Sequence, residues 1–383
     1  MRRLPARHTR RPARSHPVVR TVAAVALAVP LFALSAAWAT YAHLNANIDT
    51  ADDVEKYLGT SRPTPSVTAD PLVDGFAGKP LNILVMGIDA RDGSNAQYGK
   101  VPGQRSDSTF LVHLPADRSR VDIVSVPRDS LVDIPSCLLA DGTKTAPMTG
   151  AMFNEAFAIG SGTDKNLTTA AACTRKTFEQ DTGVRTDEHV VIKMDGVRDV
   201  IDTLGGVPFC FPEAMDSPKA KLHVEAGKQV LDGKTSIAFL RARTGTGGGL
   251  WIGSDLGRLD RQHEFLVALT DKVHHEKLLG KPAKLLKVLD QATKAISVSP
   301  GLGDLRTMAG LANGLRGIDG DEIDAITVPT VPSPTQSGRV VWTSAADDIW
   351  ERLNEDRPLT DPEPKPTGST HTPKATKPAG LCG

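Results

Sequence analysis

The stretch LNILVMG, residues 81–87, is a continuous apolar run of strand length that ends in glycine. Such a run is typical of a buried strand. Two further strands are predicted at TFLVHL (109–114) and VDIVSV (121–126), which are joined by the turn-like PADRSR. Because this connection is too short for a crossover, these two strands are expected to be antiparallel neighbours. A fourth strand is predicted at HVVIKM (189–194).

Helices are predicted between and after these strands. The clearest apolar spacing lies in 255–275, where four side chains repeat on one face: Leu259, Leu266, Leu269 and Val273. The other helical stretches are 150–159, 168–181 and 196–204. Strands mixed with helices predict a layered sheet of the α/β or α+β class.

The N-terminal region predicts a membrane anchor. Residues 1–20 hold seven arginines and no acid, and the apolar run 21–44 follows them. About 20 apolar residues suffice to cross the hydrocarbon layer, and the arginines orient the N-terminus to the cytoplasm. The alternative is a cleaved signal peptide with Ala37-Trp38-Ala39 as its cleavage motif, but its apolar part is typically about 7–15 residues long. We expect a retained single-pass anchor, and in either case the remainder of the chain lies outside the cytoplasm.

The charge balance argues against a body that binds nucleic acid. The chain has 45 basic and 45 acidic residues, but without residues 1–20 the balance is 38 against 45. The remainder therefore carries a net charge of −7, whereas a nucleic-acid-binding domain is basic overall.

The predicted organisation has five parts. Residues 1–20 form a basic cytoplasmic segment, and 21–44 form the anchor. The polar, proline-dotted segment 45–80 predicts an extracytoplasmic stalk, and 81–355 is the folded domain. The last part, 356–383, holds six prolines together with threonine and lysine, which predicts a disordered tail.

The four cysteines predict disulfides, because the compartment outside the cytoplasm lets disulfides persist. Cys137, Cys173, Cys210 and Cys382 have no CxxC spacing, so a zinc site is not expected. Three connectivities are open, and our preferred one joins Cys137 to Cys173 and leaves Cys210 for Cys382.

Two carboxylates and two arginines are predicted to meet at one edge of the sheet. The first strand exits into Asp89, the second begins after Arg105 and Asp107, and the third exits into Arg128. In a hairpin the start of one strand and the end of its partner share an edge, and Asp89 joins that edge if the first strand lies antiparallel to the second. Two close carboxylates repel unless a cation lies between them, and oxygen ligands suit Mg²⁺. For each aspartate taken alone, the ordinary alternative is a turn former or a helix cap.

A second set of candidate residues lies in RARTGTGGGLWIGSDLGRLDRQ (241–262). Asp255, Arg258 and Gln262 have the spacing of one helix face, whereas Arg241 and Arg243 share a face only in extended backbone or at a frayed helix end. The glycines between the two sets predict a flexible bridge that lets the arginines converge. Guanidinium groups fit phosphate oxygens, so the cluster predicts a bound anion.

The alternative for these arginines is a solvated surface with weak ion pairs, each worth less than about 1 kcal/mol. Other catalytic motifs are missing from the sequence. It contains no GxxxxGK[ST] phosphate loop and no GxSxG nucleophile elbow.

These motifs resemble one family, the LytR-CpsA-Psr phosphotransferases of bacterial cell envelopes. The resemblance covers most of 80–270 and is carried in order by NILVMGIDAR (82–91), RSDSTFLVHL (105–114), SVPRDSLVDIP (125–135), MFNEAFAIG (152–160), LGGVPFCFPEAMD (204–216), AGKQVLDGKTSIAFLRART (226–244) and GSDLGRLDRQHEFL (253–266). The arginine-rich N-terminus, the anchor and three of the cysteines resemble actinobacterial members.

The resemblance implies an α/β fold, a layered α-β-α domain with a central mixed β-sheet flanked by helices. It implies that 81–355 is a catalytic domain that moves a glycopolymer, such as teichoic acid, from a polyprenyl-pyrophosphate carrier to peptidoglycan at the cell membrane. By resemblance, Asp89 and Asp107 hold Mg²⁺, and Asp255 orients Arg258. The pyrophosphate is then surrounded by Arg105, Arg128, Arg241, Arg243, Arg258 and Gln262, and the polyprenyl tail lies in an apolar pocket between sheet and helices.

Two other functions remain open at this point. The same residues would serve a hydrolase of lipid pyrophosphates, with water as the acceptor. A membrane-anchored regulator that binds polyprenyl lipids without catalysis is the third possibility. The segment TGTGGGLWIG (244–253) departs from the family, which commonly has a histidine or a shorter polar loop there.

Overall fold

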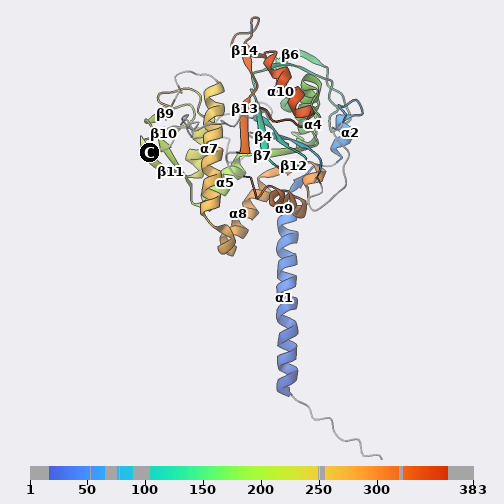
Figure 1. The fold of residues 1–383 in the computed structure, drawn as a ribbon, viewed down its shortest axis with the longest axis vertical. Helices are drawn as coiled ribbons and strands as arrows, with labels where there is room; N and C mark the ends of the chain where they lie inside the picture. Colours follow the sequence, from blue (N-terminus) through green and yellow to red (C-terminus); the bar gives the residue numbers. More distant parts are fainter. Residues whose placement is uncertain are drawn as a thin grey trace, which may run out of the picture. The chain divides into compact units, whose positions relative to one another are not determined.

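The computed structural model describes residues 17–51, 53–64, 76, 78–88, 104–248, 250, 255–318 and 322–360. The chain divides into two compact units, Met1–Leu44 and Asn45–Gly383. Helix α1 (Pro17–Asn47) contains Ala26–Asn47, which is long and apolar enough to cross a membrane. The chain therefore has one candidate membrane anchor among its described residues, as the sequence predicts (Figure 1).

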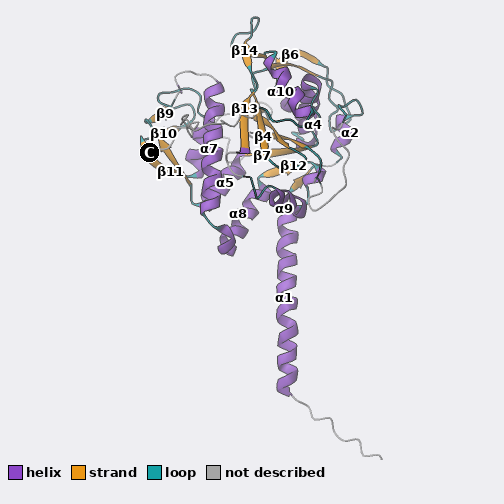
Figure 2. Cartoon of the chain, viewed as in Figure 1, coloured by secondary structure: helices purple, strands orange, loops and turns teal. Residues whose placement is uncertain are grey.

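The second unit is built on a mixed seven-stranded sheet (Figure 2). Its strands, in spatial order, are β1 (Asp49–Thr50), β12 (Ile296–Val298), β7 (Glu188–Lys193), β2 (Leu81–Ile88), β3 (Ser106–Leu114), β4 (Val121–Val126) and β13 (Ile323–Thr327). Strand β2 is buried along its whole length, in agreement with its apolar sequence. It pairs parallel to β7 and antiparallel to β3. The predicted antiparallel pairing of β3 with β4 is confirmed.

Helices and small strand pairs complete the unit. The helices are α2 (Val54–Leu58), α3 (Glu155–Ser161), α4 (Leu167–Thr182), α5 (Met194–Leu204), α6 (Gly233–Arg241), α7 (Asp255–His275), α8 (Pro282–Lys294), α9 (Leu305–Gly314) and α10 (Ala345–Asn354), with short 3₁₀ helices at η3 (Leu278–Gly280) and η4 (Pro300–Leu302). The two-stranded pairs are β5 (Leu131–Ile134) with β6 (Met148–Met152), β8 (Val207–Phe211) with β11 (Gly227–Leu231), β9 (Met215–Ser217) with β10 (Leu222–Val224), and β14 (Thr330–Pro332) with β15 (Val340–Trp342).

Alternation along β2 divides the core between the two faces of the sheet. Leu84 and Met86 point to one face and pack with residues of α3, α4 and α10. Ile83 and Val85 point to the other face, where residues of α9 pack against them. A third cluster joins β8 to β11 with helices α5, α6 and α7. The predicted layered fold with helices on both faces is confirmed.

The cysteines bear out the first predicted disulfide. Cys137 is bonded to Cys173 of α4. Helix α3 packs tightly beside this bond, because a Cβ built on Gly160 would lie 2.4 Å from the Cβ of Cys173. Cys210 is also disulfide-bonded. Its predicted partner, Cys382, lies outside the described residues.

Two segments pack differently from the sequence expectation. Part of the predicted stalk belongs to the folded unit, because β1 extends the sheet and Val54 and Leu58 of α2 are buried against α4. The first residues of the predicted tail are also packed, since Leu359 is buried and Asp356 accepts from His113 Nε2 at 3.0 Å. Both segments are too short and too polar to show this from composition. Residues 361–383 lie outside the described part.

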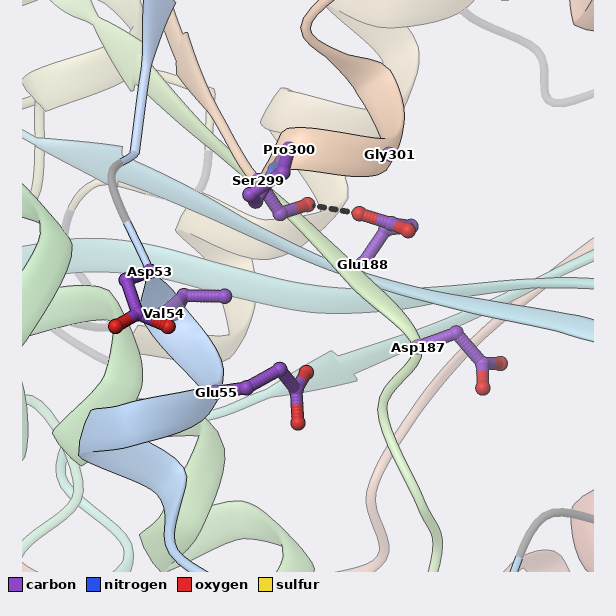
Figure 3. Close-up of a pocket in the computed structure, with 8 residues that line it drawn as sticks. All are labelled: Asp53, Val54, Glu55, Asp187, Glu188, Ser299, Pro300 and Gly301. Carbon is purple, nitrogen blue, oxygen red and sulfur yellow. Dashed lines mark hydrogen bonds between the residues drawn. The ribbon is translucent and has the colours of Figure 1, made fainter.

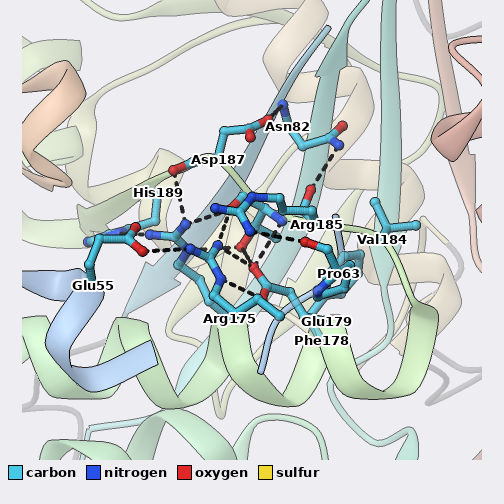
Figure 4. A network of polar contacts seen from close by, with 12 residues as sticks. Glu55, Pro63, Asn82, Arg175, Phe178, Glu179, Val184, Arg185, Asp187 and His189 are labelled. Carbon is cyan, nitrogen blue, oxygen red and sulfur yellow. Dashed lines mark hydrogen bonds and ion pairs between the residues drawn. The ribbon is translucent and has the colours of Figure 1, made fainter. Parts of the chain in front are cut away.

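A buried polar network holds the start of β7 against α4 (Figure 4). Glu179 accepts from Nε and Nη2 of Arg62 at 2.9 and 2.7 Å. Arg175 is fully buried and donates to the carbonyls of Thr186 and Asp187. Burial, with repulsion from Arg62, lowers the pKa of Arg175 to about 10. The network therefore ties Arg62, from the predicted stalk, into the core of the unit.

Asp181 at the end of α4 gives a pH-dependent prediction. Burial first, and then the nearby Asp133, raises the pKa of Asp181 to about 7. Because the folded pKa lies above the unfolded value, the stability from the protonated group is complete below pH 3.8 and is lost as the pH rises through about 7. Asp181→Asn is therefore expected to stabilise the protein by about 1–2 kcal/mol near pH 8, with a smaller gain near pH 5.

Thermal unfolding of the full-length protein in detergent tests this prediction. The matched control is Asp164→Asn, which changes an exposed carboxylate in the turn before α4. A gain from Asp181→Asn that is equal at both pH values would contradict the raised pKa.

Candidate active site

A β-bulge places Asp107 at the rim of the sheet. Gly87 lies opposite Ser108 and Ile88 lies opposite Ser106, so Asp107 is the extra residue of β3. A bulge bends its strand and redirects a side chain, and bulges are frequent beside active sites. The Asp107 side chain is 28% exposed at this point. Because of the bulge, the Asp107 side chain does not follow the regular up-and-down alternation of β3, and it lies at the edge of the sheet.

Two predicted arginines converge on Asp107 from different elements. Arg128, just after β4, donates from Nη1 to Asp107 Oδ1 at 2.7 Å. Arg243, just after α6, reaches the same oxygen from Nη2 at 3.5 Å. The structure therefore joins the two candidate sets that the sequence placed 115 residues apart, at 128 and 243. Guanidinium forks match phosphate oxygens, so an edge where two of them meet suits a phosphorylated ligand.

Arg105 lies at the same end of β3 and is held by a residue that the sequence argument missed. Its Nη2 lies 3.3 Å from Oε1 of Glu155, the first residue of α3. Asp129 is a second missed carboxylate, with Oδ2 3.4 Å from Arg128 Nε. Both occur inside quoted motifs, MFNEAFAIG and SVPRDSLVDIP, but neither has a spacing that singles it out.

The segment after α6 has the extended backbone that two arginines at i and i+2 need to share a face. Arg241 is the last residue of α6, and Nε and Nη1 of its guanidinium are buried. Ala242 is the extended C-cap, with φ −61° and ψ 130°, and is fully buried. Arg241 and Arg243 therefore flank a residue that points into the core.

Gln262 of α7 connects this helix to the rim. It donates from Nε2 to Ser108 Oγ at 2.9 Å and lies 3.5 Å from the carbonyl of Leu240 in α6. Ser108 is a further residue that sequence reasoning missed, although it follows the bulge directly. One amide thus bridges β3, α6 and α7 next to Asp107.

The glycine-rich loop is a packed structure, so the prediction of a flexible bridge is wrong for its described part. Thr246 forms an antiparallel bridge with Asp216 of β9. A Cβ on Gly245 or Gly247 would lie about 2 Å from a backbone carbonyl of the 214–216 segment, and both glycines have positive φ. The glycines are needed for this close backbone approach. A single sequence does not reveal that contact, because it joins segments distant in the chain.

Arg261 differs from the other arginines of this stretch. It is buried, with Nη2 donating to the carbonyl of Ala242 and Nη1 to the carbonyl of Gly248. These bonds fix the backbone on either side of Arg243. Arg261 therefore supports the loop and does not face the rim.

Three predicted site residues fall outside what the structure describes. Asp89 lies in the gap after β2, and the side chains of Asp255 and Arg258 are not described, although both residues lie in the first turns of α7. Their predicted roles remain predictions. The described part of the rim comprises Arg105, Asp107, Arg128, Arg243 and Gln262, and the place of Arg241 in the site stays a prediction.

A separate hollow lies at the start of β7, next to η4 (Figure 3). Four carboxylates line it, from Asp53, Glu55, Asp187 and Glu188. Burial raises the pKa values of Asp187 and Glu188. No arginine or lysine is among its lining residues, so this hollow does not suit a phosphorylated ligand.

Asp107 is the predicted Mg²⁺ ligand that falls within the described residues. Among the described residues, no three His, Cys, Asp or Glu side chains gather in a way that could hold a metal ion. Mg²⁺ is usually held by one or two carboxylates, with waters and substrate phosphates completing its shell. Asp107, a partly exposed carboxylate beside two arginines, fits that manner of binding.

The fold and the rim together define a class, an α/β protein with one candidate membrane anchor and a cluster of arginines at the edge of its sheet. Residues 41–356 match the model of the LytR_cpsA_psr family. The match covers most of the chain, which therefore belongs to this family, as the sequence motifs predicted.

Two relatives with assigned functions are similar to the chain. A probable cell wall biosynthesis protein, LcpB of Corynebacterium glutamicum, is 30% identical over 258 residues, 66% of this chain and 54% of LcpB. The polyisoprenyl-teichoic acid–peptidoglycan teichoic acid transferase TagV of Bacillus subtilis is 30% identical over 270 residues, 69% of this chain and 59% of TagV. The chain thus spans little more than half the length of these relatives.

Solved structures confirm the fold. The crystal structure of B. subtilis TagV has a TM-score of 0.51 at 23% identity and covers 73% of this chain and 99% of that one. A LytR-Csp2A-Psr enzyme from Actinomyces oris has a TM-score of 0.53 at 18% identity, with 80% and 94% coverage.

Proposed function

We propose that this protein transfers a glycopolymer from a polyprenyl-pyrophosphate carrier to peptidoglycan and forms a phosphodiester. The observation that carries the proposal is the convergence of Arg128 and Arg243 on Asp107 at the sheet rim. The transferase names of relatives such as TagV support the choice of donor and acceptor.

The rim suits phosphoryl transfer because that reaction needs charge stabilisation and positioning more than a covalent nucleophile. Guanidinium groups from β4, from the end of α6 and from the start of β3 approach one edge, and their forks match phosphate oxygens. Asp107 and Glu155 hold all three of them in place before the substrate binds. Preorganised donors of this kind lower the barrier without reorganising during the reaction.

An apolar strip extends from the rim along the same face of the sheet. Phe110 and Val112 follow Ser108 on that face of β3, and they pair with Val85 and Ile83 of β2. Phe110 and Val112 are only partly buried, as are Val190 and Ile192 of β7. A strip that is apolar and incompletely covered suits a polyprenyl chain whose pyrophosphate lies at the arginines.

In the proposed reaction, an acceptor hydroxyl of peptidoglycan attacks the phosphorus that carries the glycopolymer. The bond from this phosphorus to the oxygen of polyprenyl phosphate breaks, and polyprenyl phosphate leaves with that electron pair. Arg105, Arg128 and Arg243 bind and orient the pyrophosphate oxygens throughout. The hydroxyl proton passes to a carboxylate of the rim.

Mg²⁺ is part of this proposal. Asp107 would hold it, together with Asp89 as the sequence predicts. When bound, the ion neutralises charge on the pyrophosphate oxygens and lowers the cost of bringing two phosphates to one rim. We further propose that the N-terminus is cytoplasmic and that the catalytic domain lies outside the membrane, where peptidoglycan is found.

The test uses the full-length protein in detergent micelles with a polyprenyl-pyrophosphate-linked saccharide, Mg²⁺ and peptidoglycan fragments. Mass spectrometry is expected to detect a phosphodiester between saccharide and peptidoglycan, which disappears with EDTA and with Arg243→Ala. If polyprenyl phosphate is released and no adduct forms, the protein is a hydrolase of the lipid pyrophosphate and not a transferase. Binding of the lipid without turnover would favour a regulator.

A further inference from the structure

One continuous region of the second unit has a charge opposite to that of its surroundings. Residues 272–318 contain eight Lys or Arg and three acidic residues, a net charge of +5. The chain beyond residue 20 has a net charge of −7. The charges of this basic surface come from the last turn of α7, from η3 and α8, and from α9 with the residues just after it (Figure 1), whereas β12 and η4 between them carry no charge.

The exposed charges of the basic surface are all of one sign. The exposed Lys and Arg side chains are Lys277, Lys281, Lys287, Lys294, Arg306 and Arg316. Each of its three acids is partly buried and already engaged. Glu276 lies within 3.1 Å of three lysines, Asp290 contacts Lys294 and Asn47, and Asp304 caps α9.

The same region receives the chain directly after the anchor. Asn45 accepts from the backbone N–H of Leu305, the first residue of α9, at 3.0 Å. Asn47 donates to Asp290 of α8 at 2.9 Å. The strand that follows, β1, pairs with β12 between these two helices. Because consecutive Cα atoms are only about 3.8 Å apart, Asn45 and its partners lie close to the point where the apolar run ends at Leu44.

We propose that the basic surface docks on the headgroups of anionic phospholipids in the membrane that holds the anchor. Lys and Arg are attracted to an anionic bilayer within about a Debye length, and the covalent chain from Leu44 to Asn45 tethers this unit to the anchor. Leu286, 43% exposed beside Lys287, adds an apolar contact. Tethering makes docking intramolecular, so a few charges suffice to fix the orientation of the unit. This inference does not depend on the proposed transfer reaction.

The test uses the full-length protein reconstituted in phosphatidylcholine vesicles with and without about 30 mol% phosphatidylglycerol. A fluorophore is placed at Ala312→Cys, on the exposed side of α9, and a quencher is placed on lipid headgroups. Quenching is expected to be at least threefold stronger with phosphatidylglycerol and to fall to the phosphatidylcholine level in high salt. A label at Glu225→Cys, exposed on the acidic remainder, is expected to show no such dependence.

Matched charge variants separate this surface from general electrostatics. Lys277, Lys287, Arg306 and Arg316 are changed to Gln in one protein, which is expected to lose the lipid dependence. The control changes four exposed lysines elsewhere to Gln, namely Lys144, Lys219, Lys228 and Lys234, and is expected to retain it. Circular dichroism confirms that both variants fold.

Three outcomes overturn the proposal. One is equal quenching of the Ala312→Cys label in the two kinds of vesicle. Another is an equal loss of the lipid dependence in the two charge variants. The third is a label at Ala312→Cys that responds to soluble polyphosphate and not to phosphatidylglycerol vesicles, which would assign the surface to an anionic polymer.

Discussion

Asp107→Asn is expected to lower kcat for phosphodiester formation by about 100- to 1,000-fold. The substitution keeps the shape of the side chain and the bulge of β3. It removes the charge that holds Arg128 at 2.7 Å and Arg243 at 3.5 Å from one oxygen. It also removes a proposed Mg²⁺ ligand.

The Michaelis constant for the lipid donor separates this mechanism from a simple loss of binding. Neutralising Asp107 adds one net positive charge to the arginines of the rim, which offsets a weaker hold on Mg²⁺, so the ground-state attraction for pyrophosphate is expected to change little. KM is therefore expected to stay level or fall while kcat collapses, which is the signature of lost transition-state stabilisation. Steady-state kinetics with purified lipid donor measure both constants.

Asp117→Asn is the matched control for Asp107→Asn. Asp117 lies in the turn of the same β3–β4 hairpin, at the opposite end from the rim, and is exposed. Its carboxylate accepts from Ser119 within the turn. Activity within twofold of the parent is expected. If Asp107→Asn retained more than a tenth of the parent's kcat, Asp107 would leave the proposed machinery.

The sheet was predictable because its signals are local. The apolar run of β2 requires burial on both faces, and the short connection between β3 and β4 forces their antiparallel pairing. The meeting of Asp107 with Arg128 follows from that hairpin. The charge and chemistry of the arginines suggest that Arg243 lies near Asp107 and Arg128. The contact itself depends on how α6 and α7 pack, which the sequence does not show.

Other features depend on contacts between distant segments, and the sequence contains no periodic signal for them. The bulge at Asp107 shows only in the register of β2 against β3. Glycine permits both disorder and close packing, so the sequence alone predicts a flexible loop. The bridge between Thr246 and Asp216 of β9 shows that this loop is packed. The sequence places Arg62 in a polar stalk. It gives no sign of the contact with Glu179, because that partner is more than a hundred residues away.

Glu179→Gln is expected to destabilise the protein by about 3–5 kcal/mol. The Glu179 and Arg62 side chains are only 4% and 5% exposed, and two hydrogen bonds join them. Thr186 also donates to Glu179 from its backbone N–H at 3.0 Å. The glutamine would leave the Arg62 and Arg175 guanidinium groups buried together without the carboxylate between them.

Glu55→Gln is the control, because Glu55 pairs with the same arginine from the surface. Its carboxylate lies 2.8 Å from Arg62 Nη1 and is 62% exposed. Solvent screens such a pair, so a loss below about 1 kcal/mol is expected. Urea unfolding of the full-length protein in detergent compares the two variants, and equal losses would show that burial does not decide the strength of the pair.

The pH dependence of Glu179→Gln provides an independent check. Burial alone would raise the pKa of Glu179, but hydrogen bonds from Arg62 and Thr186 outweigh it and hold this pKa below its usual value of 4.5. The stability that the ionised group contributes is therefore present above pH 4.5 and is lost as the pH falls through the lower, folded pKa. The difference between the parent and Glu179→Gln is expected to be constant at neutral pH and to shrink in acid. A difference that grows in acid would mean that Glu179 is protonated in the folded protein, and the buried ion pair with Arg62 would then not exist.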